Sequence, residues 1–287
     1  MKISTGEKVF HLFNALFMTC IVIVTLYPLW YVIVASFSNN AEVMKAGGVM
    51  FTIKGFTLAA YAQVVRFKAV WTGYGNTLFI VIVGTTLNII MTAIGGYFLS
   101  RKNVALQKYV AVGVVVTMYF SGGMIPTYLI VKDLGLYNST LALILPTAIS
   151  TYNMIIMRSA FAAVPVSLEE SAKIDGARHI TIMFKIMLPL IKPTLAVLIL
   201  YYGIAHWNSW FNAMIYLKER SKFPLQLILR EIILENQTNE NMTTDGEQIG
   251  ETIQYATIVI ATLPILCLYP FMQKYFEKGV MIGSVKE

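Results

Sequence analysis

Charged residues are scarce in this chain of 287 residues. Asp, Glu, Lys and Arg make up 13% of it, whereas hydrophobic residues make up 57% and the mean hydropathy is +0.66. Soluble domains usually carry about 25% charged residues, so the composition excludes a disordered chain and argues against a soluble globular protein. The net charge of +7 does not indicate nucleic-acid binding, because the basic residues lie between apolar blocks and do not form one patch.

Cysteine is also rare, and the common catalytic motifs are missing. Cys20 and Cys267 lie far apart in apolar stretches, and no Cys-x-x-Cys or Cys/His cluster supports a metal or redox site. The chain contains no phosphate-binding G-x-x-x-x-G-K-[ST] loop, no G-x-S-x-G and no H-E-x-x-H. We therefore expect no catalytic residue, no bound metal, no cofactor held by this chain and no enzyme activity of its own.

Long uncharged stretches dominate the rest of the sequence. A helix that crosses a bilayer needs about 20 largely apolar residues, and six stretches without Asp, Glu, Lys or Arg are long enough. The sequence thus predicts an all-α membrane protein with six transmembrane helices in a single transmembrane domain, 1–287. The expected spans are 10–38, 76–100, 109–131, 138–158, 186–216 and 252–274.

The charges between these spans predict the orientation of the chain. Cytoplasmic loops of membrane proteins carry an excess of Lys and Arg. Placing both termini in the cytoplasm puts 13 of the 22 Lys and Arg residues on that side. Because no carboxylate, Lys or Arg lies within the six stretches, a proton-driven carrier is disfavoured. An energy source in another subunit fits better.

One predicted cytoplasmic loop, 165–189, has the pattern of a helical hook. Pro165 suits the first turn of a helix, and Glu169 and Lys173 form an i,i+4 pair. Gly176 can end that helix in a tight turn, after which a second short helical segment leads into the next span. Such a hook is suited to docking into a partner's groove. From spacing alone, an amphipathic loop lying on the lipid surface is an equally good alternative.

The same loop carries a recognisable motif. It reads Glu170-Ser171-Ala172, then Gly176, then Ile186-Met187-Leu188-Pro189, and it resembles the coupling loop of ABC importer permeases (E-A-A, then G, then I-x-L-P). Ser171 replaces the first alanine, and the I-D-G-A string that ends at Ala177 is typical of the carbohydrate branch. The resemblance implies that the residues coupled to the ATPase are Glu169, Glu170, Ser171, Ala172, Asp175, Gly176 and Ala177.

The C-terminus carries a second, independent motif. Its last residues read K-G-V-M-I-G-S-V-K from position 278 to 286. This string resembles the tail of maltose-type permease subunits, in the polysaccharide-permease subgroup that works with lipoprotein receptors. The resemblance implies that Gly279, Gly283, Ser284 and Lys286 lie at the ATPase interface. A weaker match is W-N-S-W-F-N at 207–212, which is similar to a segment near the outer end of the fifth span.

These resemblances together imply a function. The chain is similar to a transmembrane permease subunit of an ATP-driven importer for oligo- or polysaccharides, with the type I ABC importer fold, in the bacterial plasma membrane. The implied partners are a second homologous permease, an ATPase dimer that binds ATP-Mg, an extracellular sugar-binding lipoprotein and membrane lipid, with no nucleic acid. Two alternatives are an ABC permease for a non-sugar solute and a secondary carrier or channel.

Residues that contact the sugar are harder to select. Aromatic and amide side chains in the spans are candidates for the substrate path, although Trp and Tyr near helix ends also serve as interfacial anchors. The candidates are Tyr119, Tyr152, Asn153, Trp207, Asn208 and Trp210. In the maltose-type pair the other permease holds most of the sugar, so this chain could contact little of it. His206 is favoured as a hydrogen-bonded packing residue over a ligand.

A glycine and proline cluster interrupts the third predicted span. The string S-G-G-M-I-P at 121–126 can free backbone groups for a ligand where it faces a cavity. It can equally allow close packing of helices through small residues. Both interpretations stay open at this point.

Overall fold

The computed structural model describes residues 4–101, 103–238, 252–267 and 270, and all regular structure in them is helical. The described helices gather into two compact units. One unit draws on the described residues 4–70, 229–238 and 252–263, and the other on 71–101, 103–228, 264–267 and 270.

The first unit is built on one long apolar helix. Helix α1 (Thr5–Ser36) begins with a capping box between Ser4 and Glu7, and no side chain of its most apolar window is buried within the chain. Apolar helices exposed in this way are stable in lipid or against another subunit. Two short helices follow, α2 (Asn40–Lys45) and α3 (Ala59–Arg66).

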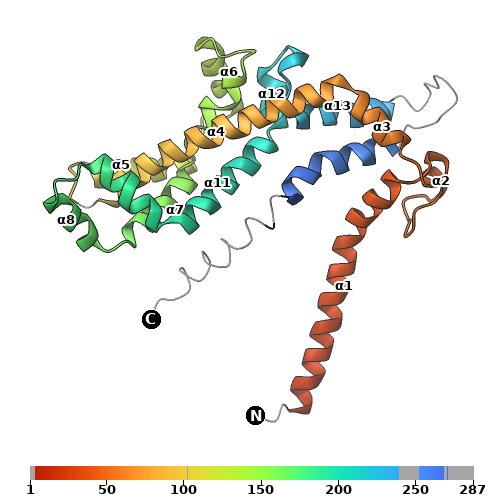
Figure 1. The fold of residues 1–287 in the computed structure, drawn as a ribbon, viewed down its shortest axis with the longest axis horizontal. Coiled ribbons are helices and arrows are strands. Elements are labelled where there is room, and N and C mark those ends of the chain that lie inside the picture. The colour runs from red at the N-terminus through yellow and green to blue at the C-terminus, as the bar shows by residue number, and fades with distance from the viewer. Residues whose placement is uncertain (1–3, 102, 239–251, 268–269, 271–287) are drawn as a thin grey trace. The chain divides into compact units, whose positions relative to one another are not determined.

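The second unit is organised around α4 (Lys68–Ser100), which Figure 1 shows as a long helix. Its side chains are mostly apolar, but Thr77, Thr85, Asn88 and Thr92 are buried along it. Three of these four find partners on other segments. Thr77 Oγ1 accepts a hydrogen bond from the Leu225 amide at 2.8 Å, Asn88 Nδ2 donates to the Thr147 carbonyl at 2.6 Å, and Thr92 Oγ1 meets the Tyr202 hydroxyl at 2.7 Å. A polar stripe of this kind fixes the register of the surrounding helices, because unpaired polar groups are costly in an apolar interior.

Several of the remaining helices meet at sharp bends. The third expected span, 109–131, falls on two helices, α5 (Gln107–Tyr119) and α6 (Met124–Asp133), which meet at 114°. Gly123 lies in the break with φ +87°, a backbone conformation that side chains disfavour. The expected break at the glycine cluster is therefore present.

Two further bends divide the fourth and fifth expected spans. Two 3₁₀ turns, η1 (Thr140–Leu143) and η2 (Leu145–Thr147), precede α7 (Thr151–Ala162), with a bend of 50°. The segment His179–Leu190 meets α11 (Lys192–Trp207) at 90°. Prolines flank this second bend at 189 and 193, where each can start a helical segment but cannot continue the hydrogen-bond ladder of the preceding one.

The lengths of the helices bear on the number of membrane spans. By length and composition, two helices could cross a membrane, or up to five if each bent pair is one span. The sixth expected span, 252–274, begins in the helix Thr252–Cys267 and then leaves the described residues, so the number six remains a prediction.

The other helices are α8 (Val166–Ile174), α9 (His179–Thr181), the π-helical turn η3 (Ile182–Met187), α10 (Leu188–Leu190), α12 (Trp210–Tyr216), η4 (Arg220–Lys222) and α13 (Leu225–Thr238).

Close contact between α4 and α7 yields a first prediction. A Cβ atom at Gly96 would lie 2.7 Å from Met157 Cγ and 3.1 Å from the Arg158 amide nitrogen. We expect Gly96→Val to destabilise the protein by about 1–3 kcal/mol, the usual cost of overpacking, measured as a lower thermal unfolding temperature in detergent. The matched control is Gly75→Val in the same helix, where a Cβ would meet nothing within 4 Å. An equal loss in both variants would show that close packing at Gly96 is not the cause.

Candidate coupling site and substrate cavity

The segment 165–189 contains a short helix, a turn and a second helical segment, the local shape that its sequence predicts. Pro165 precedes the first turn of α8, and Asp175 ends the helix. The chain then reverses at Gly176, whose φ is +80°, while the Ala177 amide donates to the Ala172 carbonyl at 2.9 Å. This pattern satisfies the last carbonyls of the helix in the manner of a glycine C-cap.

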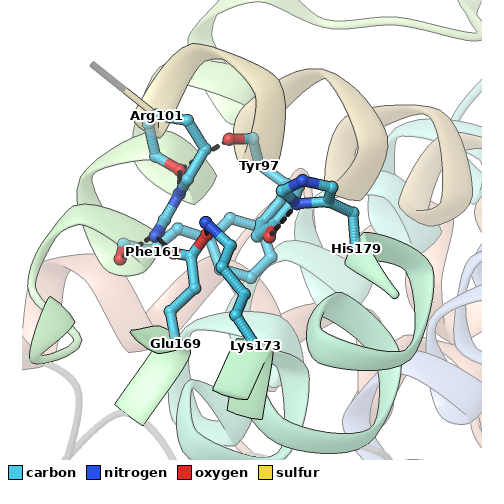
Figure 2. A network of polar contacts seen from close by, with 7 residues as sticks. Tyr97, Arg101, Phe161, Glu169, Lys173 and His179 are labelled. Atoms are coloured by element: carbon cyan, nitrogen blue, oxygen red, sulfur yellow. Dashed lines mark hydrogen bonds and ion pairs between the residues drawn. The ribbon is translucent and has the colours of Figure 1, made fainter. Parts of the chain in front are cut away.

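A buried carboxylate fastens the hook to the rest of the second unit (Figure 2). Glu169 Oε2 pairs with Arg101 Nη1, and Glu169 Oε1 accepts from Lys173 Nζ at 2.9 Å. Arg101 also donates from Nη2 to the Phe161 carbonyl at 3.1 Å. The Glu169 side chain is only 5% exposed and that of Arg101 13%. One ion pair therefore ties α8 to the C-terminal end of α4 and, through Phe161, to the end of α7.

Aromatic contacts extend this network. The Arg101 guanidinium lies 5.0 Å from the centroid of the Tyr97 ring, a cation–π distance. The Tyr97 hydroxyl meets Nδ1 of His179 at 3.4 Å. Figure 2 shows these side chains converging from α4, α8 and the start of α9. The second arm of the hook is thus attached to the same point on α4 as the first.

The electrostatics of Glu169 favour its charged form. Burial alone would raise the pKa of this carboxyl, but the hydrogen bond from Lys173 and the positive charges of Arg101 and Lys173 outweigh burial and lower the pKa. Because the folded-state pKa is lowered, the pair contributes stability above the unfolded pKa and loses it as the pH falls through the folded pKa. The network is therefore intact at neutral pH.

The two faces of α8 have different surroundings. Glu169 and Ala172 are buried, with residue exposures of 4% and 7%, so the structure turns these two expected coupling residues toward the permease itself. The outward-facing members of the expected set are Glu170, Ser171, Asp175 and Gly176, with Ala177 half-buried. Direct contact with a partner is available to the outward set, whereas the carboxylate of Glu169 is already engaged inside the chain.

A second candidate site is a cavity of about 540 Å³ in the same unit. It lies where the η2–α7 break faces the end of α11 and the start of α12. Of the six substrate-path candidates, only Asn153 and Asn208 line it. The lining residues are Leu143, Pro146, Thr147, Ile149, Ser150, Asn153, Tyr201, Tyr202, Ala205, His206, Asn208, Ser209, Phe211 and Asn212.

The four other candidates lie outside this cavity. Tyr119 and Tyr152 are 77% and 55% exposed on other surfaces. Trp207 is buried with its ring 6.2 Å from that of Tyr74, and Trp210 packs against an apolar cluster in the second unit. Hydrophobic periodicity could not show which of these candidates face the cavity. Side chains one residue apart on a helix point about 100° apart, so adjacent candidates have different surroundings.

The cavity also contains residues that the sequence did not single out as ligands. His206 forms the expected hydrogen bond, from Nε2 to Asn88 Oδ1 at 2.6 Å, but it also lines the cavity beside Tyr201 and Asn212. One signal in the sequence could have indicated this wall: Thr85, Asn88 and Thr92 recur at helical spacing on one face of an otherwise apolar helix.

Two other expectations concern the C-terminal tail and the absence of a metal site. The tail residues Gly279, Gly283, Ser284 and Lys286 lie outside the described residues. Within residues 4–101, 103–238, 252–267 and 270, no group of three His, Cys, Asp or Glu side chains lies close enough to hold a metal ion.

Comparison with known proteins assigns the chain to a family. Residues 96–282 match the family of binding-protein-dependent transport system inner membrane components. The chain belongs to this family. Protein LplC of Bacillus subtilis (strain 168) is 42% identical over 100% of this chain and 98% of the relative. The polygalacturonan/rhamnogalacturonan transport system permease protein YtcP of the same organism is 39% identical over 94% of this chain and 96% of the relative.

A solved structure gives the fold. One chain in the crystal structure of a bacterial ABC transporter involved in the import of the acidic polysaccharide alginate is 32% identical to this permease. The two superpose with a TM-score of 0.89, covering 96% of this chain and 99% of the other. The fold is therefore that of an ABC importer permease of type I, as the sequence predicts.

Proposed function

We propose that this chain is a transmembrane permease subunit of an ATP-driven importer for oligo- or polysaccharides. The cargo class is supported by relatives whose names or descriptions concern polygalacturonan and alginate transport, and by the I-D-G-A form of the hook. The permease works with a second homologous permease, two ATPase subunits that bind ATP-Mg, and an extracellular sugar-binding lipoprotein. It has no ATPase site of its own.

The observation that carries the mechanism is the buried attachment of the hook to α4. In the proposed mechanism, the exposed face of α8 and the turn that follows it contact the ATPase through Glu170, Ser171, Asp175 and Gly176. Movement of α8 during ATP binding is passed through the Glu169–Arg101 pair to α4. Because the buried polar groups of α4 hold the segments that wall the cavity, movement of that helix alters the substrate path.

The membrane topology belongs to the same proposal. We place six spans in the plasma membrane with both termini, the hook and the tail on the cytoplasmic side, as the distribution of Lys and Arg supports. The tail residues Gly279, Gly283, Ser284 and Lys286 reach the ATPase interface. The cavity beside Asn153 and Asn208 then belongs to the path of the sugar.

The test is to extract the chain gently from its native membrane and identify by mass spectrometry what co-purifies. We expect a second permease, an ATPase and a sugar-binding lipoprotein, and we expect the reconstituted complex to take up the sugar carried by that lipoprotein only when ATP is supplied. Purification of the chain alone, or as a homo-oligomer without an ATPase, would refute the proposal and favour a carrier or channel.

A further inference from the structure

The cavity of about 540 Å³ has a mixed lining of apolar side chains and uncharged polar groups. Among the residues that the structure describes, its lining includes the amides of Asn153, Asn208 and Asn212 and the hydroxyl of Tyr201, but no Lys, Arg, Asp or Glu. A volume of this size falls within the range of sites for small ligands. Tyr201 and Phe211, both more than a third exposed, add aromatic surface. Convergent amides and aromatic rings in an uncharged wall can bind the hydroxyl groups and the apolar face of a sugar ring.

Asn153 contributes a polar side chain to the wall of the cavity. It is only 6% exposed, and its backbone amide is satisfied by Ser150 Oγ at 3.4 Å. Its side-chain amide makes no hydrogen bond within the part of the chain that the structure describes. This amide lines the cavity, so it is available to donate to and accept from a ligand or the water that a ligand replaces.

The histidine in the wall is held in one orientation. Asn88 donates from Nδ2 to the Thr147 carbonyl, which turns its Oδ1 toward the imidazole of His206. An amide oxygen only accepts hydrogen bonds, so Nε2 of His206 carries the hydrogen. The ring therefore forms a fixed part of the wall, and Asn88 acts as its positioning residue.

We propose that this cavity is a subsite for one uncharged sugar unit, recognised through its hydroxyl groups, and that it disfavours the carboxylate of a uronic acid. The inference rests on the proposed function. Hydroxyl groups both donate and accept, as the amides Asn153, Asn208 and Asn212 do. A carboxylate entering the same space would lose its water without gaining a cation from any lining residue, and such a loss is strongly unfavourable. A charged unit of the cargo is consequently accommodated elsewhere along the path.

The test compares two probes of the same chain length, trigalacturonate and its methyl ester, in which an uncharged ester replaces each carboxylate. The permease–ATPase complex is placed in nanodiscs without the binding protein, and each labelled probe is measured by equilibrium dialysis. We expect the ester to bind at least about tenfold more tightly than the acid, and Asn153→Leu to weaken ester binding about tenfold, because a lost buried hydrogen bond has effects of this order. Asn14→Leu on the exposed surface of α1 is the matched control and should leave binding unchanged.

A second variant keeps the test informative if Asn153→Leu does not fold. Asn208 is exposed at the cavity, so Asn208→Lys adds a cation there without disturbing packing. It should raise affinity for the acid about tenfold and abolish the preference for the ester, since a partnered carboxylate binds well. Equal binding of both probes to the wild-type complex, absence of ester binding, or no effect of Asn208→Lys would overturn the inference.

Failure of the subsite and failure of the proposed function give different results. ATP-driven uptake and the presence of the ATPase are measured in the same preparation. If uptake and the ATPase are present while the probes bind equally, only the subsite is refuted. If no ATPase accompanies the chain, the proposed function is refuted, and the subsite that rests on it is refuted too.

Discussion

Arg101→Met is expected to abolish coupled transport and to destabilise the protein by about 3–5 kcal/mol, the usual cost of removing one partner from a buried ion pair. The variant leaves the Glu169 carboxylate in a nearly closed environment, where its remaining cation among the described residues is Lys173, whose side chain is 46% exposed. It also removes the hydrogen bond to the Phe161 carbonyl. Thermal unfolding in detergent, and the ratio of sugar imported to ATP hydrolysed in proteoliposomes, measure the two effects.

The double variant Arg101→Met/Glu169→Met separates stability from coupling. Replacing both members of a buried pair by apolar residues is often neutral or stabilising, so most of the lost thermal stability should return. Coupling should remain impaired, because the ion pair that connects α8 to α4 is absent. Full recovery of coupled transport in the double variant would show that packing alone transmits the movement.

An exposed ion pair is the matched control for this experiment. Glu42 and Lys45 on α2 pair at 3.0 Å, with side-chain exposures of 37% and 73%. Surface pairs contribute about 0–1 kcal/mol, so Lys45→Met should change neither the unfolding temperature nor the coupling ratio appreciably. A loss comparable with that of Arg101→Met would mean that removal of any positive charge has the same effect.

The attachment of the hook illustrates what the sequence can predict and what it cannot. The pair Glu169–Lys173 follows from i,i+4 spacing and is present at 2.9 Å, and the turn at Gly176 follows from the need for a positive φ after the helix. Arg101 lies 68 positions from Glu169. No local rule connects two such residues, because their contact depends on how α4, α7 and α8 pack.

The bends in the helices were likewise predictable from the sequence only in part. The glycine cluster predicts the break before α6, because Gly123 adopts a conformation that other residues avoid. The sequence predicts one span over 186–216, but the structure divides this segment at Ile191 and again at Asn208. Proline at helix starts explains the first division. The cavity arises from these breaks together, so the sequence could suggest Asn153 and Asn208 as candidates without separating them from Tyr119 or Tyr152.

Gly176→Val is expected to uncouple transport from ATP hydrolysis. The backbone at this position has φ +80°, and a Cβ atom there would meet nothing within 4 Å. The cost of the substitution is therefore conformational strain of about 1–3 kcal/mol, which a β-branched residue relieves by opening the turn between α8 and α9. Because this turn lies at the exposed end of the proposed ATPase contact, we expect sugar uptake to fall by about tenfold or more, as misplacement of a contact by about 1 Å can cause, while ATP hydrolysis continues.

Two further variants identify the cause of that loss. Gly135→Val introduces the same kind of strain at a φ of +70°, again with nothing within 4 Å, but in the segment that follows α6; it should lower thermal stability without uncoupling. Gly176→Asn should retain most of the uptake, since asparagine tolerates the left-handed conformation better than other side chains. If asparagine fails as completely as valine, the glycine is needed for close approach of the partner and not for the shape of the turn. Unchanged uptake in Gly176→Val would remove the hook from the coupling mechanism altogether.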